Sequence, residues 1–115
     1  MRALRLIRRV TRLDRMRSAN IRRELDVESW SEVVERRQLS WYGHIKRMND
    51  ARYPARFYNW QPEGRRPAGR PRRRWRDGVA EAIARRRMTL EEVEERGLYM
   101  DRSVWRGFVR DRAMP

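Results

Sequence analysis

The residues with the clearest chemical potential are arginines gathered in one short stretch of the chain. Seven of the twelve residues from 65 to 76 are arginine and none is acidic, so the stretch carries +7, half of the net charge of +14. A guanidinium is planar and always charged, and it can bind a phosphate through two parallel hydrogen bonds or stack on a base. A codon bias toward arginine would also raise the arginine content, but it would not concentrate the charge. The placement therefore predicts a phosphate-binding segment.

The candidate nucleic-acid-binding residues are these seven arginines and one neighbouring tryptophan: Arg65, Arg66, Arg70, Arg72, Arg73, Arg74, Arg76 and Trp60. Each arginine that neutralises a phosphate releases a condensed counterion, so affinity should fall steeply with salt. Trp60 and Trp75 flank the stretch and could stack on unpaired bases. A core position is the plainer interpretation of both, because Trp75 shares a helical stripe with Val79 and Ile83.

The tripeptide Gly69-Arg70-Pro71 resembles the core of an AT-hook, which lies extended in the minor groove of DNA. Ala68 stands before it, where an arginine is usual, so plain phosphate contact is favoured over groove insertion. The prolines and glycines could equally form a stiff spacer that holds the arginines away from the fold. A solvated or nuclear-import segment is the remaining alternative.

Nothing else in the chain predicts an active site, a metal site or a cofactor. The chain has no cysteine, and His44 is its only histidine, for which we expect a structural hydrogen bond within a helix. The acidic residues are scattered, most of them at expected helix ends, and form no paired-aspartate motif for two-metal catalysis. We therefore expect a protein that is not an enzyme and needs no cofactor.

The segments that must position the arginines all show helical periodicity. The sequence predicts an all-α fold, a small bundle of about five or six helices without a strand. We expect one domain over residues 1–115, with an exposed basic loop at 60–72 rich in arginine, proline and glycine. Apolar residues make up 39% of the chain, which allows a modest core. No run of about eighteen apolar residues is present, so we expect no membrane span.

The longest predicted helix runs from a capping box at Ser29–Glu32 to about Met48. Its apolar residues recur on one face, which we expect to be buried: Trp30, Val34, Trp41, Ile45 and Met48. Gly43 lies inside this helix at a cost of about 1 kcal/mol against alanine, which indicates close packing of another element there.

Shorter helices are predicted on either side. Residues 1–17 form an amphipathic helix, although a transit peptide is an alternative. Ser18 caps a helix that carries Ile21 and Leu25, and Pro54 begins one that ends near residue 60. Residues 61–71 form a loop. Three helices then follow, the first with Trp75, Val79, Ala82 and Ile83 inward, the second capped at Thr89 and ended by Gly97, and the third capped at Asp101 with Trp105, Phe108 and Val109 inward.

Two long motifs give the chain a family resemblance. Residues 36–48, RRQLSWYGHIKRM, resemble a motif in the C-terminal region of non-LTR (LINE-type) retrotransposon reverse transcriptases. Residues 64–77, GRRPAGRPRRRWRD, are similar to that region's second hallmark, glycine-arginine-proline-basic-x-tryptophan-x-aspartate. The tryptophan helix expected at 101–112 and the stretches at 11–15 and 21–25 also resemble the family, so the likeness spans most of the chain.

The resemblance implies a nucleic-acid-binding tail of a target-primed reverse transcriptase, as a fragment or a domesticated copy. It does not imply polymerase activity, because the palm motif with its paired aspartates is missing. As partner we expect RNA or DNA, with RNA slightly preferred because a stem-loop offers both phosphates and splayed bases. We expect an intracellular protein of the nucleus or nucleolus, and leave its oligomeric state open. The alternative function is a protein-interaction module that binds an acidic partner or a polymerase core through tryptophan and arginine surfaces.

Overall fold

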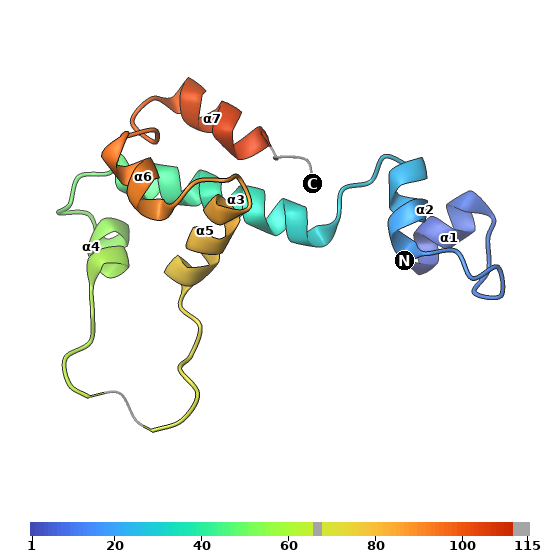
Figure 1. Ribbon diagram of the computed structural model, residues 1–115, viewed down its shortest axis with the longest axis horizontal. Coiled ribbons are helices and arrows are strands. Elements are labelled where there is room, and N and C mark those ends of the chain that lie inside the picture. The colour runs from blue at the N-terminus through green and yellow to red at the C-terminus, as the bar shows by residue number, and fades with distance from the viewer. Residues whose placement is uncertain (66–67, 112–115) are drawn as a thin grey trace. The chain divides into compact units, whose positions relative to one another are not determined.

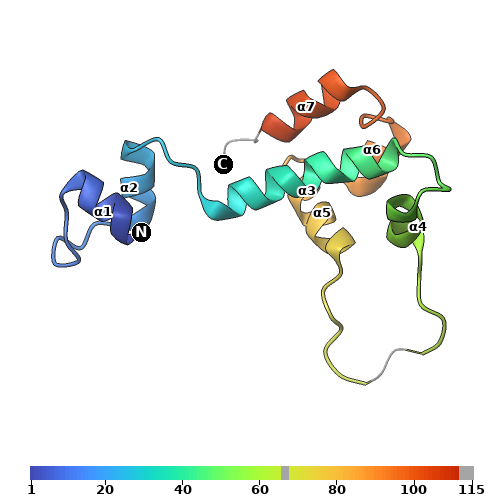
Figure 2. The same ribbon diagram turned by 180° about the vertical axis from the view of Figure 1, so that it is seen from behind.

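A computed structural model describes residues 1–65 and 68–111, and it contains helices but no strand in that part of the chain. The described helices are α1 (Arg2–Arg8), α2 (Ser18–Glu24), α3 (Trp30–Lys46), α4 (Tyr53–Asn59), α5 (Trp75–Ala84), α6 (Leu90–Glu95) and α7 (Arg102–Arg110) (Figures 1 and 2). The predicted all-α fold is confirmed, with seven helices in the described residues rather than five or six.

Residue contacts divide the chain into two compact units. The first covers Met1–Val34 and the second Glu35–Pro115, so the boundary falls inside α3. The first unit holds α1 and α2, and the second holds the rest of α3 with the four helices that follow. The expectation of one domain over residues 1–115 stays a prediction.

In the first unit, the predicted helix over residues 1–17 is wrong beyond Arg8. Arg9 adopts a left-handed backbone with φ of 57° and ends α1. Asp14 then accepts hydrogen bonds from the backbone N–H of Thr11 at 2.6 Å and from its hydroxyl at 2.9 Å, and so stabilises a turn where the helix was expected. The predicted apolar stripe is not buried, since Leu13 is 90% exposed.

The two helices of this unit meet at a small apolar contact and an ion pair. Ile21 on α2 is fully buried, and Arg8 and Glu24 form a salt bridge at 2.5 Å. Ser18 is the first residue of α2 and makes no capping bond, because Arg17 occupies the cap position. Exposed pairs such as Arg8–Glu24 contribute little, and Ile21 is the one residue of α1 and α2 that is buried.

The second unit is held together by one apolar core to which α3, α5, α6 and α7 all contribute. Its buried members are Leu39, Tyr42, Val79, Ala82, Ile83, Val93, Trp105 and Val109. Figures 1 and 2 show α3 lying lengthwise with α7 along it and α5 and α6 beside it. The inward positions predicted for Val79, Ala82 and Ile83 are confirmed.

The tightest contact in the core joins α3 to α7 at a glycine. A Cβ atom added at Gly43 would collide with Nε1 of Trp105, so only glycine admits the indole at this depth. The same indole nitrogen donates a buried hydrogen bond of 2.9 Å to the carbonyl of Leu39. The close packing predicted at Gly43 is therefore confirmed, and Trp105 is the element that packs there.

The buried face of α3 differs from the predicted one except at Ile45, which is buried. Its buried residues are Leu39, Tyr42, Gly43 and Ile45, whereas Trp30 is 79% exposed and Trp41 is 49% exposed. Apolar residues occupy more than one side of this helix. The predicted side was the one that carries the tryptophans, because these are its largest apolar residues. The packing instead selects the side on which Gly43 leaves room for another side chain.

Capping bonds set the start of four helices. The reciprocal bonds predicted at Ser29 with Glu32 and at Thr89 with Glu92 are present, at 2.7 to 3.3 Å. The carboxylate of Asp101 accepts the backbone N–H groups of Ser103 and Val104, as its predicted cap role requires. A fourth cap, which was not predicted, is Asp77, which accepts the N–H of Arg74 at 2.7 Å at the start of α5.

One arginine ties α5 to the end of α7. Arg86 follows α5, and its guanidinium donates to the carbonyls of Ala82 at 2.7 Å, Phe108 at 3.1 Å and Val109 at 3.0 Å. The last carbonyls of a helix lack partners within the helix, so this arginine supplies them. Burial lowers the pKa of Arg86, and the neighbouring charge of Arg85 adds to that effect.

A carboxylate links α6 to α3. Glu94 accepts a hydrogen bond of 2.9 Å from the Tyr42 hydroxyl and forms an ion pair of 3.1 Å with Lys46. Burial alone would raise the pKa of Glu94. The hydrogen bonds from Lys46 and Tyr42, with the positive charges of Lys46 and Arg76, outweigh burial, so its pKa lies below the ordinary value.

Among the described helices, none combines the length and the apolar character that crossing a bilayer requires.

The glycine contact predicts opposite effects of alanine at two helical glycines. We expect Gly43→Ala to destabilise the protein by about 1 to 3 kcal/mol, because the new methyl group collides with Trp105. Gly107 lies in α7 with no heavy atom within 4 Å of an added Cβ, so Gly107→Ala should stabilise by up to about 1 kcal/mol. Urea unfolding followed by circular dichroism measures both, and equal effects would contradict the assigned packing.

The Glu94 link predicts a stability difference that depends on pH. Because the folded-state pKa of Glu94 is depressed, its contribution is present above the unfolded pKa of about 4.3 and is lost as pH falls through the folded value. We expect Glu94→Gln to cost about 1 to 2 kcal/mol at neutral pH and progressively less below about pH 4. Glu95→Gln, on the exposed side of the same helix, is the matched control, and a pH-independent cost at Glu94 would contradict the assignment.

Candidate nucleic-acid interface

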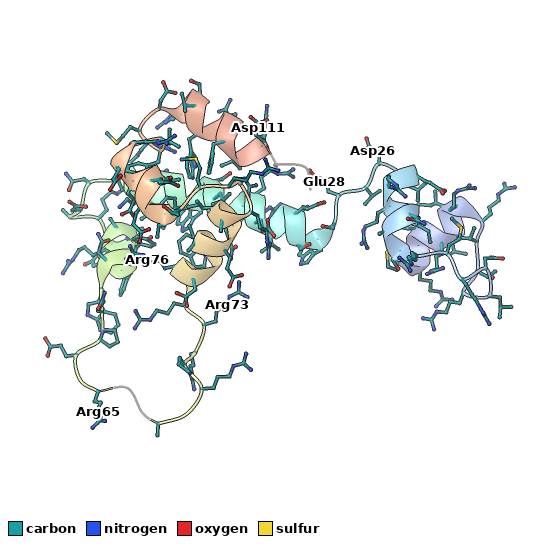
Figure 3. All side chains as sticks on the ribbon, in the orientation of Figure 1. Asp26, Glu28, Arg65, Arg73, Arg76 and Asp111 are labelled. Atoms are coloured by element: carbon teal, nitrogen blue, oxygen red, sulfur yellow. The ribbon has the colours of Figure 1, made fainter. Side chains whose placement is uncertain are left out.

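The basic loop leaves the fold between α4 and α5. Residues 60–65 and 68–74 form neither helix nor strand and are exposed throughout. Figures 1 and 3 show this segment running out from the helices and back, with Arg65 in its outer part and Arg73 near its return. Gly64 and Gly69 adopt φ of 97° and 120°, which side chains other than glycine rarely tolerate. The candidate Arg66 lies outside the described residues.

Most of the described loop arginines have no acidic partner. Arg65, Arg70 and Arg72 form no ion pair with any described residue. Arg73 pairs with Glu81 at 2.5 Å, but both side chains are more than half exposed, so this pair contributes little to stability. The structure therefore leaves most of this charge available to an external anion.

The two arginines at the start of α5 lie beside aromatic side chains. Arg74 and Arg76 line a groove of about 480 Å³ together with Trp41, Phe57, Tyr58, Trp60 and Trp75. We call this the α4–α5 groove. The Arg76 guanidinium lies over the Tyr58 ring, 5.8 Å from its centre. Proteins that bind unpaired nucleotides combine positive charge, which contacts the phosphates, with aromatic side chains, on which the bases stack. The α4–α5 groove contains both.

The tryptophans of this groove are surface residues. Trp60 is 65% exposed and Trp75 is 38% exposed, so the core positions favoured by the sequence analysis are wrong for both. Trp75 packs edge-on against Tyr58 at 5.9 Å and thereby joins α5 to α4. Of the five tryptophans only Trp105 is buried, which leaves large flat surfaces available for contacts outside the fold.

Tyr58 combines a packed ring with an unpaired hydroxyl. Its ring also lies edge-on to Tyr42 at 5.9 Å, while its hydroxyl oxygen is buried and has no hydrogen-bond partner. Burial raises the pKa of Tyr58, against the opposing effect of the Arg76 charge. Tyr58 and Phe57 were not among the predicted site residues, although their position directly before the loop was a usable signal.

The acidic and histidine side chains of the described residues were compared with the clusters that bind metal ions. Acidic and histidine side chains form no group of three or more that could hold a metal ion within residues 1–65 and 68–111. His44 is exposed, and it makes a ring contact with Trp41 at 5.2 Å in place of the hydrogen bond we expected. It faces solvent because the buried side of α3 lies around Tyr42 and Gly43.

Comparison with known proteins gives one relative of interest. No protein-family model matches the chain, and no solved structure matches it. The chain is 29% identical over 106 residues to an uncharacterized transposon-derived protein of Caenorhabditis elegans. The match covers 85% of this chain and 38% of the relative, so the chain spans well under half the length of the protein it resembles.

The exposure of Trp60 and the burial of Trp105 predict different costs for the same substitution. Trp60→Ala should change the free energy of unfolding by less than about 0.5 kcal/mol, because the indole is largely in solvent. Trp105→Ala should cost about 3 to 5 kcal/mol, since it empties a core site and removes the buried hydrogen bond to the Leu39 carbonyl. Chemical denaturation measures both, and a large cost at Trp60 would show that this residue is an anchor of the fold.

Proposed function

We propose that the chain binds nucleic acid without catalysing a reaction, through the arginine loop and the adjoining α4–α5 groove. The observation that carries this proposal is the exposure of Arg65, Arg70 and Arg72 without acidic partners, directly beside a groove that contains Trp60. In this arrangement the loop arginines neutralise phosphates, while the exposed indoles stack on bases that are not paired.

RNA is the preferred ligand in this proposal. An RNA stem-loop presents backbone phosphates and splayed bases together, whereas a regular DNA duplex hides the faces of its bases. The exposed faces of Trp60 and Trp75 can stack only on the splayed bases of the RNA stem-loop. Arg74 and Arg76 lie close enough to the same groove to contact the phosphates on either side of a stacked base.

Similarity to a transposon-derived protein supports the origin suggested by the two motifs. We propose that the chain corresponds to the C-terminal region of a non-LTR retrotransposon reverse transcriptase, as a fragment or a domesticated copy that acts in the nucleus or nucleolus. The residues of the first motif include Leu39 and Gly43, which hold Trp105 of the last helix. The second motif supplies the loop and the start of α5. In this interpretation the first motif builds the scaffold and the second provides the ligand-binding residues.

The proposal predicts a change in the salt dependence of binding. The loop variant Arg65→Gln, Arg70→Gln, Arg72→Gln removes three exposed charges, and we expect it to reduce the slope of log affinity against log salt by about 2, at about 0.7 per contact with single-stranded nucleic acid. Fluorescence anisotropy with an RNA stem-loop and a DNA duplex of matched sequence measures this slope. The control variant Arg12→Gln, Arg87→Gln, Arg96→Gln removes the same charge from exposed sites outside the loop and the groove.

Equal slopes in the wild type, loop variant and control variant would contradict the loop assignment. The relative affinities of the wild type for stem-loop and duplex decide between RNA and DNA. Binding to an acidic protein partner that persists at high salt and disappears in Trp60→Ala would favour the alternative, a protein-interaction module, because tryptophan and arginine dominate protein interfaces.

A further inference from the structure

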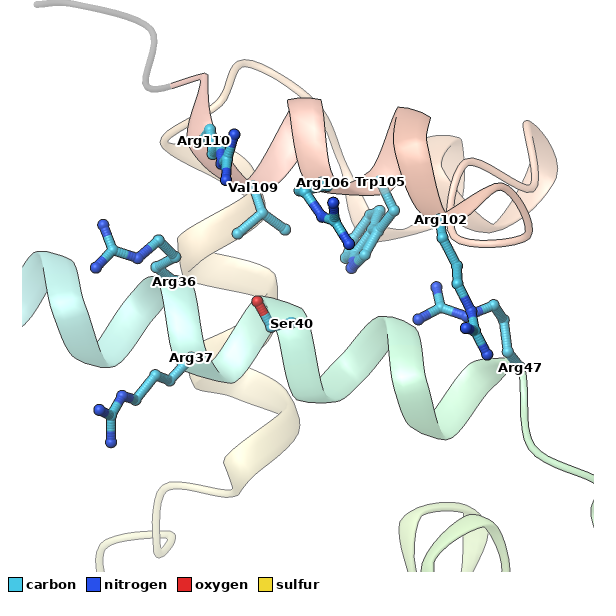
Figure 4. Close-up of a pocket in the computed structure, with 9 residues that line it drawn as sticks. All are labelled: Arg36, Arg37, Ser40, Arg47, Arg102, Trp105, Arg106, Val109 and Arg110. Carbon is cyan, nitrogen blue, oxygen red and sulfur yellow. The ribbon is translucent and has the colours of Figure 1, made fainter.

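A second cluster of arginines lies between α3 and α7, in a groove of about 510 Å³ (Figure 4). The groove is lined by nine residues, six of them arginine: Arg36, Arg37, Arg47, Arg102, Arg106 and Arg110. None of the nine is acidic. We call this the α3–α7 groove. It is formed by helices on both sides, unlike the extended loop, so the packing of α3 and α7 sets the backbone positions of its arginines.

The arginines of α7 have no internal counter-charge. Arg102, Arg106 and Arg110 form no ion pair among the described residues. Two acidic residues adjoin the row in the chain. The carboxylate of Asp101 is occupied by the backbone N–H groups that begin α7, and Asp111, directly after Arg110, forms no ion pair among the described residues. The row of arginines on α7 therefore carries positive charge that no ion pair among the described residues neutralises.

Two guanidinium groups crowd one end of the groove. Figure 4 shows Arg47 from α3's C-terminal end next to Arg102 from the start of α7. Arg47 donates to the carbonyl of Tyr99 at 2.5 Å, but its Nε is buried and has no hydrogen-bond partner. Burial lowers the pKa of Arg47, and repulsion from Arg102 adds to that effect. An anion between the two groups would relieve the repulsion.

The spacing of the charges suits a polymer better than a small anion. Arg102, Arg106 and Arg110 follow one another at four-residue intervals, so they form a row on one side of α7 with a rise of about 6 Å between neighbours. A single phosphate can use only two or three such donors at one point. A nucleic-acid strand presents negative charges at regular intervals along its length, and it can use the whole row.

We propose that the α3–α7 groove is a second phosphate-binding surface, which holds the backbone of a nucleic acid independently of the arginine loop. This inference rests on the proposed function, since it assigns a further site for the same class of ligand. Two separate sites on one unit would allow the protein to hold two segments of one folded RNA, or two strands, at the same time.

The test uses a groove variant, Arg102→Gln, Arg106→Gln, Arg110→Gln, which is matched in charge to the loop and control variants. All three side chains are exposed, so the variant should keep its helical circular dichroism and its unfolding midpoint. Arg47 is left unchanged because of its bond to Tyr99. We expect the salt slope for the RNA stem-loop to fall by about 2, with at least a ~10-fold loss of affinity at ~0.1 M salt. The control variant should show a much smaller change.

A cross-link locates the ligand directly. The chain has no cysteine, so Ser40→Cys places a unique thiol on the exposed surface of the α3–α7 groove. A photoreactive group attached there should cross-link to the RNA stem-loop, while the same group at Glu91→Cys on α6 should not. Unlabelled RNA should suppress the cross-link, but inorganic phosphate at equal ionic strength should not.

The outcomes separate this inference from the proposed function. If the loop variant weakens binding but the groove variant behaves as the control, the loop function stands and the second site is overturned. Equal cross-linking from residues 40 and 91 would also overturn it, and suppression by inorganic phosphate would indicate a small-anion site instead. If the wild type binds neither RNA nor DNA, both proposals fail together.

Discussion

The second unit depends on the contact between the Trp105 indole and the backbone of α3 at Gly43. The indole reaches this depth because glycine has no side chain, and its N–H then satisfies the Leu39 carbonyl. This contact holds α7 along α3, and Arg86 holds the end of α7 to α5 by three bonds to backbone carbonyls. A small core can thus support several short helices, because directional bonds fix their positions where apolar area is limited.

Arginine serves two distinct purposes in this molecule. Arg86 and Arg47 are partly buried and donate to backbone carbonyls, so their charge is part of the fold. Arg70 in the loop and Arg106 in the α3–α7 groove make no ion pair with described residues. The first kind stabilises the protein by itself, whereas the second kind raises its electrostatic energy until an anion arrives. Composition counts both kinds together, and only their placement separates them.

The sequence predicted the local features well and the choice of buried surface poorly. Caps such as Thr89 and Asp101 were recognised because their bonds involve residues two or three positions apart. The buried side of α3 was misjudged, because it depends on Trp105, more than sixty residues away. The exposure of Trp60 and the whole α3–α7 groove were missed for the same reason: periodicity within one helix carries no information about which distant helix will cover it.

The edge-on contact of Tyr58 with Trp75 affects how the sequence of the basic loop can evolve. It closes the base of the basic loop, and the described loop residues between these two aromatics take no part in the core. The entropic cost of a flexible loop grows slowly with its length, by about 0.6 kcal/mol for each doubling. Insertions, deletions and substitutions in the loop can therefore accumulate while the scaffold keeps its stability. Under the proposed function, ligand preference can evolve separately from folding.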